Sequence, residues 1–317
     1  VDGYLGPSEV LVLADETANA KFVAADLIAQ AEHDPGSCFL LTTSNEMAER
    51  VRHEISSQLN QRQRRAAIEK SLDNDSAIIV GDSMNDLIDL ANRCNVGPWL
   101  CMPHRANDDF LRRAASLVSE KLDARLPLWV EHSNEVWNPD FEQSAYASQQ
   151  GMAQGLAPDA NTARWRWHAK RSRDLFAIWS QPFAGSMRLK RVLGTQTGNS
   201  WGTQQLLRDP VIDTTDVLAV AAYLPLTPGV NTSPAAAEVA RWPLERVFEH
   251  FEKELEQLER WQAEQRRWCA RHGLLLAAYE GGQHAVGLGE AVRDAALERL
   301  FTQANRDERM GLMYRRL

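Results

Sequence analysis

The sequence predicts an α/β fold in which parallel strands alternate with helices. Short apolar runs recur along the 317 residues, and amphipathic or charged helical stretches separate most of them. Eight such runs can be counted, and eight strand–helix units are enough to close a (β/α)8 barrel. Two of the runs end in a glutamate, Glu135 and Glu280, at the strand end where such barrels carry their functional side chains. We therefore expect a barrel-like fold.

The expected strands are short and rich in Val, Leu, Ile and aromatic residues, as strands with buried faces are. They cover residues 9–14, 38–41, 77–80, 98–102, 127–130, 189–194, 216–223 and the run that ends at Glu280. After that last run, Gly281 and Gly282 are expected to let the backbone turn sharply.

The expected helices follow from apolar spacing and capping residues. Phe22, Val23, Leu27 and Ile28 share one face of the first helix. The third helix has Ser83 as N-cap with Asp86 three residues later, close to a capping box. Together the helices cover residues 17–33, 45–72, 83–95, 108–122, 139–183 with a looser middle at Gly155–Pro158, 246–272 and 290–306.

Composition divides the chain unevenly. Residues 1–96 contain 16 acidic and 8 basic residues and no tryptophan, whereas the rest contains 27 of each charge and all ten tryptophans. This change suggests two origins, and we expect domains at 1–82 and 83–317. An acidic chain without a basic patch argues against a nucleic-acid partner. The absence of an 18-residue apolar run argues against a membrane span. The oligomeric state is not predicted.

The first third carries a specific resemblance. It rests on the segments Gly6–Val12, Ala14–Asn19 and Ala25–Asp34, followed by Leu40–Thr43 and Ala77–Val80. These segments closely resemble histidinol dehydrogenase as far as about Arg93. The resemblance implies a Rossmann-like N-terminal segment and gives Gln30 and His33 as candidate zinc ligands. Spaced i,i+3, the two side chains would share one helix face.

The remaining dehydrogenase machinery is not found in the sequence. In that family a catalytic Glu-His pair is expected after Arg93, where this chain has Cys94-Asn95-Val96-Gly97. The other two zinc ligands have no counterpart, and two ligands do not hold a zinc ion. Gln30 and His33 are alternatively polar residues at a helix end. We therefore expect no cofactor.

The rest of the chain resembles a bacterial family of clan A-type glycoside hydrolases, which are (β/α)8 barrels. The resemblance rests on Pro98–His104, Trp129–Asn138, Val192–Gln196 and Ala278–Gly282. It implies a retaining β-glycoside hydrolase with Glu135 as acid/base and Glu280 as nucleophile. Strands one and two of that family should precede Ser83 and its last strand is not reached, so a hybrid or incomplete barrel is expected.

The chemistry of retaining hydrolysis suits these residues. Two carboxyl groups roughly 5–5.5 Å apart are needed, one protonated and one ionised. Trp137 beside Glu135 would raise the pKa of the acid, and Asn134 would bind the sugar 2-hydroxyl. Glu135 is alternatively a helix cap, and single tryptophans are more often core residues. The predicted substrate-binding residues are Asn134, Trp137, His104, Trp99, Gln196, Asn199, Trp201, Tyr223 and Tyr279.

Three functions follow from these resemblances. The first is hydrolysis of a polysaccharide, with carbohydrate as the partner and secretion or the periplasm as the location. The second is an inactive hybrid or truncated chain with at most glycan binding. The third is a zinc- and NAD-dependent histidinol dehydrogenase, with the cytoplasm as the location. The sequence favours the first.

Overall fold

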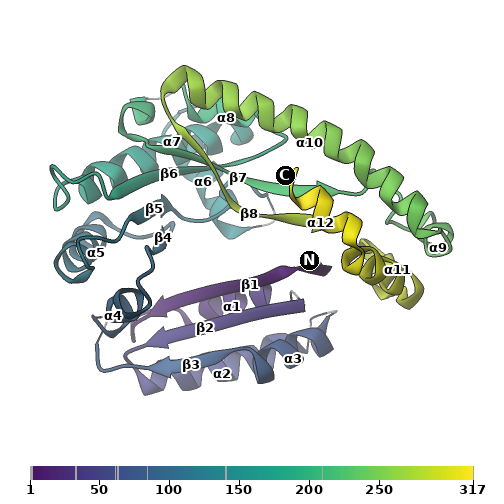
Figure 1. Cartoon of the computed structure of the whole chain (residues 1–317). Helices are drawn as coiled ribbons and strands as arrows, with labels where there is room; N and C mark the ends of the chain where they lie inside the picture. The colour runs from purple at the N-terminus through teal and green to yellow at the C-terminus, as the bar shows by residue number, and fades with distance from the viewer. Residues whose placement is uncertain are drawn as a thin grey trace. The chain divides into compact units, whose positions relative to one another are not determined.

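The chain forms two compact units in the computed structural model, which describes residues 3–32, 34–60, 62, 64–83, 85–139, 141–208 and 210–316. The first unit combines Val1–Leu87, Tyr223–Gln257 and Gly281–Leu317, and the second combines Ile88–Ala222 and Leu258–Glu280. Strands β7 and β8 and the long helix α10 run from one unit into the other (Figure 1). The domain boundary expected at 82/83 stays a prediction.

The first unit is built on a three-stranded parallel sheet with the order β1-β2-β3. Its register places Val12 beside Leu40 and Leu40 beside Ile78. Each strand is followed by helix, as the alternating pattern predicts. The elements are β1 (Gly3–Ala14), α1 (Ala20–Ala31), β2 (Asp34–Thr42), α2 (Asn45–Leu59), α3 (Arg65–Asn74) and β3 (Ala77–Val80).

The core of this unit lies between one face of the sheet and the helices. Leu27 and Ile28 of α1, Met47 of α2 and Ile68 of α3 are buried in one cluster with Leu40 of β2. Asn19 begins α1 by accepting a hydrogen bond from the backbone N–H of Lys21. Phe22 was predicted to share one face with Val23, Leu27 and Ile28; those three side chains are buried, whereas Phe22 is 44% exposed.

The single helix predicted over residues 45–72 is wrong. Helix α2 ends at Leu59, and α3 begins at Arg65. Residues 60–65 are all Asn, Gln or Arg. The sequence offers no apolar side chain there whose burial would offset the entropy of continuing the helix.

The second unit is built on a five-stranded sheet with the order β4-β5-β6-β7-β8, in which β4 to β7 pair in parallel. In the register of this sheet, Trp99 lies beside Trp129, and Val192 lies beside Val217. The strands are β4 (Trp99–Met102), β5 (Leu128–His132), β6 (Leu189–Gln196), β7 (Val217–Pro225) and β8 (Leu275–His284).

Helices cover this sheet around a core in which Trp165, Phe176 and Trp179 are fully buried. The stretch predicted as helical over 139–183, with a looser middle, forms two helices, and Asp159 caps the second one after the loose segment. Helix α8 was not predicted. The helices are α4 (Asn85–Cys94), α5 (Asp108–Lys121), α6 (Glu142–Ala153), α7 (Ala160–Ser180), α8 (Ser200–Leu206), the 3-10 turn η1 (Pro210–Thr214) and α10 (Leu244–His272).

A barrel-like fold, hybrid or incomplete, was expected, and the described strands do not form a closed (β/α)8 barrel. They form two open sheets of three and five strands, and the α/β class with parallel strands is confirmed. Strand count was predicted well, but alternation of strands and helices does not determine which strands pair. Barrel closure needs consistent tilt and stagger around the whole sheet, and these are not visible in the sequence.

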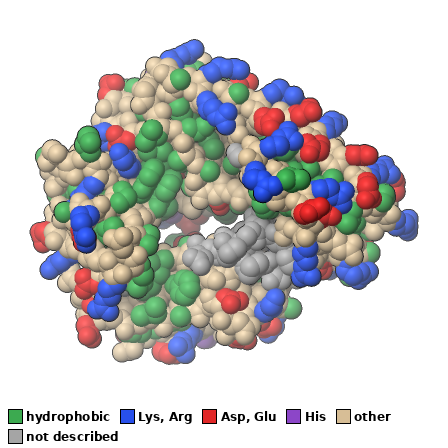
Figure 2. Space-filling model, in the orientation of Figure 1, with side chains coloured by type: hydrophobic (Ala, Val, Ile, Leu, Met, Phe, Trp, Pro, Cys, Tyr) green, Lys and Arg blue, Asp and Glu red, His purple; other side chains and the backbone are tan. Residues whose placement is uncertain are grey.

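The last part of the first unit is helical. It contains α9 (Ala236–Val239), the 3-10 turn η2 (Gly289–Arg293), α11 (Ala295–Arg306) and α12 (Glu308–Tyr314). Acidic and basic side chains alternate over the face of α10 seen in Figure 2, and Glu252 pairs with Arg316 at 2.6 Å. Within the described residues, no helix is long and apolar enough to span a membrane.

Candidate functional site

Strand β5 ends in a strained turn. Ser133 and Glu135, which follow the strand, have φ angles of 62° and 45°. Such left-handed conformations cost a non-glycine residue of order 1–3 kcal/mol, and they persist only where the surroundings hold them. The backbone N–H of Ser133 donates to the carbonyl oxygen of Met102 at 2.7 Å, which ties this turn to strand β4.

Glu131 is the most unusual side chain beside this turn, and the sequence analysis did not single it out. It is 4% exposed, and it accepts hydrogen bonds from Trp99 Nε1 at 3.1 Å and from Cys101 Sγ at 3.9 Å. Burial raises its pKa to about 8, with a smaller contribution from the charge of Glu135. The carboxyl therefore holds its proton near neutral pH, as a buried acid without a cation does.

The predicted catalytic and aromatic residues lie partly around Glu131. Trp137 Nε1 donates to the hydroxyl of Tyr279 at 2.9 Å, and Asn138 Nδ2 donates to Glu135 Oε2 at 3.1 Å. Burial raises the pKa of Tyr279 far above its usual value, and the charges of Glu135, Glu131 and Glu280 add to this effect. The two predicted carboxylates therefore both lie within electrostatic reach of Tyr279.

Two buried histidines lie on the other face of β5. His132 Nδ1 and His168 Nδ1 are 3.1 Å apart, and His132 packs edge-on against the ring of Trp167. One nitrogen must donate and the other accept, so when both rings are neutral they carry opposite tautomers at Nδ1. Burial lowers the pKa of His168 to about 4, and burial also lowers the pKa of His132 well below its usual value, with contributions from His168, Arg171 and His104.

Several predicted sugar-binding residues have structural roles instead. Trp99 stacks on Trp129 with ring centroids 5.3 Å apart and an interplanar angle of 7°. Asn199 caps helix α8 by accepting from the backbone N–H of Gly202 at 2.8 Å. His104 is half-buried, and it accepts from Arg105 Nε at 3.2 Å.

The remaining candidates are not gathered into one site. Asn134, Gln196 and Trp201 are exposed, and Trp201 lies on helix α8. Tyr223 belongs to the first unit, where its ring contacts His284. Glu280 is exposed, and strand β8 continues past its two following glycines to residue 284, so the expected sharp turn is wrong.

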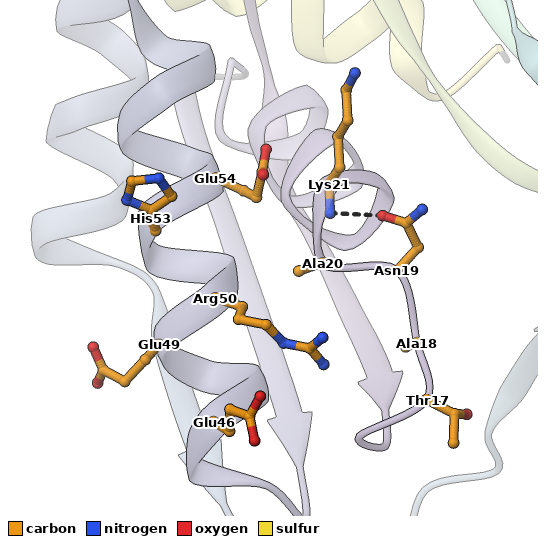
Figure 3. Close-up of a pocket in the computed structure, with 10 residues that line it drawn as sticks. All are labelled: Thr17, Ala18, Asn19, Ala20, Lys21, Glu46, Glu49, Arg50, His53 and Glu54. Carbon is orange, nitrogen blue, oxygen red and sulfur yellow. Dashed lines mark hydrogen bonds between the residues drawn. The ribbon is translucent and has the colours of Figure 1, made fainter.

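The first unit carries a separate groove of about 720 Å³ at the carboxyl ends of strands β1 and β2 (Figure 3). Parallel α/β sheets bind ligands at this edge. The side chains of Arg50 and Glu54 extend from α2 toward the start of α1, whereas Glu49 and His53 point away from it. The lining residues are Thr17, Ala18, Asn19, Ala20, Lys21, Glu46, Glu49, Arg50, His53 and Glu54.

The charges in this groove are mixed and slightly acidic. Three carboxylates stand against one lysine and one arginine, and Arg50 Nη2 already donates to the carbonyl oxygen of Glu16 at 2.9 Å. The turn of residues 15–19 between β1 and α1 contains no glycine. The phosphate-binding turns of dinucleotide folds need glycines so that the backbone can approach the pyrophosphate. A pyrophosphate therefore does not fit this groove.

The candidate zinc ligands are only partly described. Gln30 has a buried Nε2 without a hydrogen-bond partner, and His33 lies outside the described residues. No group of three or more His, Cys, Asp or Glu side chains able to hold a metal ion is found in the part of the chain that the structure describes. The donor set seen does not fit a zinc site.

Comparisons with known proteins bear on the first third of the chain. Residues 1–98 match the family model of histidinol dehydrogenase. Three curated histidinol dehydrogenases are similar. That of Methanocaldococcus jannaschii is 49% identical over 94 residues, that of Dehalococcoides mccartyi 46% over 112, and that of Lactococcus lactis subsp. lactis 45% over 94. These alignments cover 29%, 35% and 29% of this chain and 21%, 26% and 22% of the three relatives.

A crystal structure of histidinol dehydrogenase from Elizabethkingia anophelis also matches, at 21% identity and a TM-score of 0.31. The match covers 56% of this chain and 44% of that one. The chain thus spans between a fifth and a half of the length of the relatives that it matches.

These matches contradict the glycoside hydrolase prediction and its carbohydrate substrate. The matching family and relatives are dehydrogenases, and they confirm the resemblance of the first third. Export of the protein was predicted only from the glycosidase interpretation, so it falls with that interpretation. Glu135 and Glu280 stay predicted functional residues, without a reaction assigned to them.

Proposed function

We propose that this chain is a histidinol dehydrogenase-like protein that binds a cationic amino alcohol of the histidinol type and does not oxidise it on its own. The observation that carries this proposal is the match of residues 1–98 to the dehydrogenase family, at 45–49% identity to three relatives. The location that we propose for this protein is the cytoplasm.

The groove of the first unit supports the binding of a cation. Glu46 and Glu54 belong to the three carboxylates that line it. A protonated amine pairs with a carboxylate in a charge-assisted hydrogen bond, which is stronger than a hydrogen bond between neutral groups. Lys21 and Arg50 leave the formal charge of the lining at −1, which disfavours phosphate groups.

The absence of oxidation is supported by the segment after Arg93. The family's Glu-His pair is expected there, and the chain has Cys94-Asn95-Val96-Gly97 instead. Asn95 adopts a φ of 54° just after α4. Neither a glutamate nor a histidine stands in this segment, so the family's pair of acid–base groups is not supplied there.

Calorimetric titration of the full chain tests the proposal. Histidinol is expected to bind, and Glu54→Gln should weaken binding about tenfold because one charge-assisted pair, of order 1.5 kcal/mol, is lost. Glu69→Gln, on α3 and outside the groove, is the matched control and should bind as the wild type does. Absence of histidinol binding to the folded wild type would refute the proposal.

A second measurement tests the missing oxidation. The chain is incubated with histidinol, NAD and zinc, and NADH is followed by its absorbance. No NADH is expected above the rate without protein. Sustained NADH formation would show that catalytic groups other than the family's Glu-His pair are present, and the proposal would then be wrong in this respect.

A further inference from the structure

The end of strand β5 is held by buried ionisable groups on both of its faces. Glu131 is buried on one side against Trp99, and His132 is buried on the other against His168. The backbone that follows is strained at Ser133 and Glu135. A strained turn that depends on its supports is poised to change when one support changes its charge.

We propose that Glu131 is a proton-dependent latch for the turn of residues 133–138. With its carboxyl protonated, the turn keeps its strained form and the contact between Trp137 and Tyr279. Loss of that proton to solvent releases the turn and breaks the contact. The latch belongs to the second unit and does not depend on the function proposed for the first.

The surroundings of Glu131 make its ionised form costly. On strand β4, the Trp99 indole N–H and the Cys101 thiol donate to Glu131 and offset part of this cost, but the raised pKa shows that burial outweighs them. Strand β6 presents Gly194, where an added Cβ would lie 2.5 Å from Glu131 Oε1, so no space for water remains on that side. In the part of the chain that the structure describes, no Lys or Arg pairs with Glu131. An ionised carboxylate there is buried without a cation.

The charged neighbours of Glu131 oppose its ionisation as well. Glu135, on the turn itself, raises the pKa of Glu131. Strand β8 contributes Tyr279 and Glu280, and the charges of all three carboxylates act on Tyr279. Burial raises the pKa of Tyr279 far above its usual value, so its hydroxyl stays neutral while Glu131 titrates.

The histidines on the opposite face do not titrate in the same range. The pKa of His168 is lowered to about 4 and that of His132 lies well below its usual value, with Arg171 and His104 as the charged or titratable neighbours. Both rings are therefore neutral near pH 8. A transition at that pH belongs to Glu131, whose pKa is about 8.

The turn connects Glu131 to a contact that can be observed. Repulsion between ionised Glu131 and Glu135 pushes the turn away from the strand end, since like charges at close range repel strongly in a desolvated site. Asn138 moves with Glu135, because its Nδ2 donates to that carboxylate at 3.1 Å. Trp137 lies between them, and its indole N–H leaves the Tyr279 hydroxyl.

Indole N–H signals in ¹⁵N-labelled full chain test the latch. Trp99 donates to Glu131 directly and reports its ionisation, whereas Trp137 donates to Tyr279 and reports the turn. The two signals are assigned with Trp99→Phe and Trp137→Phe and followed from pH 6 to 9. Both are expected to shift with one midpoint near pH 8.

Two variants sharpen the result. Glu131→Gln should leave both signals independent of pH, and Glu135→Gln should move the common midpoint to lower pH because one repelling charge is gone. A Trp99 shift without a Trp137 shift in the wild type would overturn the latch, since Glu131 would then titrate without moving the turn. Absence of both shifts would overturn it too. The titration itself is made on the wild type, so the test holds even if Glu131→Gln or Glu135→Gln does not fold.

Discussion

Acid should destabilise the second unit through the buried pair His132–His168. Burial lowers the pKa of His168 from 6.5 to about 4 in the folded chain. Between pH 6.5 and 4, His168 binds a proton in the unfolded chain but not in the folded chain. The free energy of unfolding therefore falls as the pH is lowered and levels off below pH 4. At 1.36 kcal/mol per pH unit, the loss between these limits is about 3 kcal/mol.

The variant His168→Asn isolates this effect. The side-chain amide of asparagine takes the place of Nδ1, so a hydrogen bond to His132 is kept while the titrating ring is removed. At pH 7 the variant should be less stable than the wild type, since the packing of a buried ring is lost. The deficit should shrink by about 3 kcal/mol as the pH falls from 6.5 to 4, because only the wild type loses the stability that depends on His168. His132 is present in both proteins.

Comparison with a variant is needed because Glu131 acts in the opposite direction. Its pKa is raised from 4.5 to about 8, so its contribution to stability is fully present below pH 4.5 and is lost as the pH rises through 8. Between pH 4.5 and 6.5 the two trends oppose each other in the wild type. In the difference between wild type and His168→Asn, the contribution of Glu131 cancels.

Urea unfolding followed by tryptophan fluorescence measures these free energies. Nine of the ten tryptophans, all except Trp242, belong to the second unit, so the signal reports that unit. His53→Asn, an exposed histidine of the first unit, is the control and should show no such trend. A deficit of His168→Asn that stays constant from pH 7 to 4 would refute the reasoning.

Three further substitutions test packing and capping, each by urea unfolding. Gly194→Ala should lower the free energy of unfolding by about 1–3 kcal/mol, since the added Cβ would lie 2.5 Å from Glu131 Oε1. The loss should be smaller in a Glu131→Ala background. An equal loss in that background would argue against the clash. Gly151→Ala should lower the free energy of unfolding by a similar amount, because the added Cβ would clash with the carbonyl oxygen of Ala163, where α6 packs on α7. An unchanged free energy of unfolding would mean that the two helices separate easily. Asn107→Ala should cost about 1 kcal/mol through loss of the α5 cap, with Asn107→Ser nearly neutral.

The sequence predicted secondary structure where apolar spacing and caps agree. The strands that contain Val12, Leu40 and Val130 were predicted, and so was the polar start of α4, where Ser83 N–H donates to Asp86 at 3.0 Å. Predictions were wrong where packing decides. The helix break after Leu59 depends on the absence of a tertiary contact, and the pairing of strands into two sheets depends on geometry that no local pattern encodes.

In the candidate site, too, the sequence does not show which single residues are enclosed by tertiary packing. Glu135 was singled out because a carboxylate at a strand end has no packing role. Glu131 occupies an alternating strand position four residues earlier, where a charged residue is normally solvent-facing. Only the structure shows that this face of β5 is covered, since the contacts that bury Glu131 come from Trp99, Cys101 and Gly194, far away in the sequence.

The buried acid also explains why a strand-end motif is a poor guide to reaction class. A raised carboxyl pKa beside aromatic rings was expected at Glu135 as the mark of a glycosidase acid, and the structure places that property on Glu131. Its two hydrogen-bond donors and its close neighbour at Gly194 enclose the group from several strands. A general acid must reach its substrate within hydrogen-bond distance, and a carboxyl that is 4% exposed does not. The same burial that raises a pKa thus removes Glu131 from direct catalysis and leaves it the role of controlling the turn beside it.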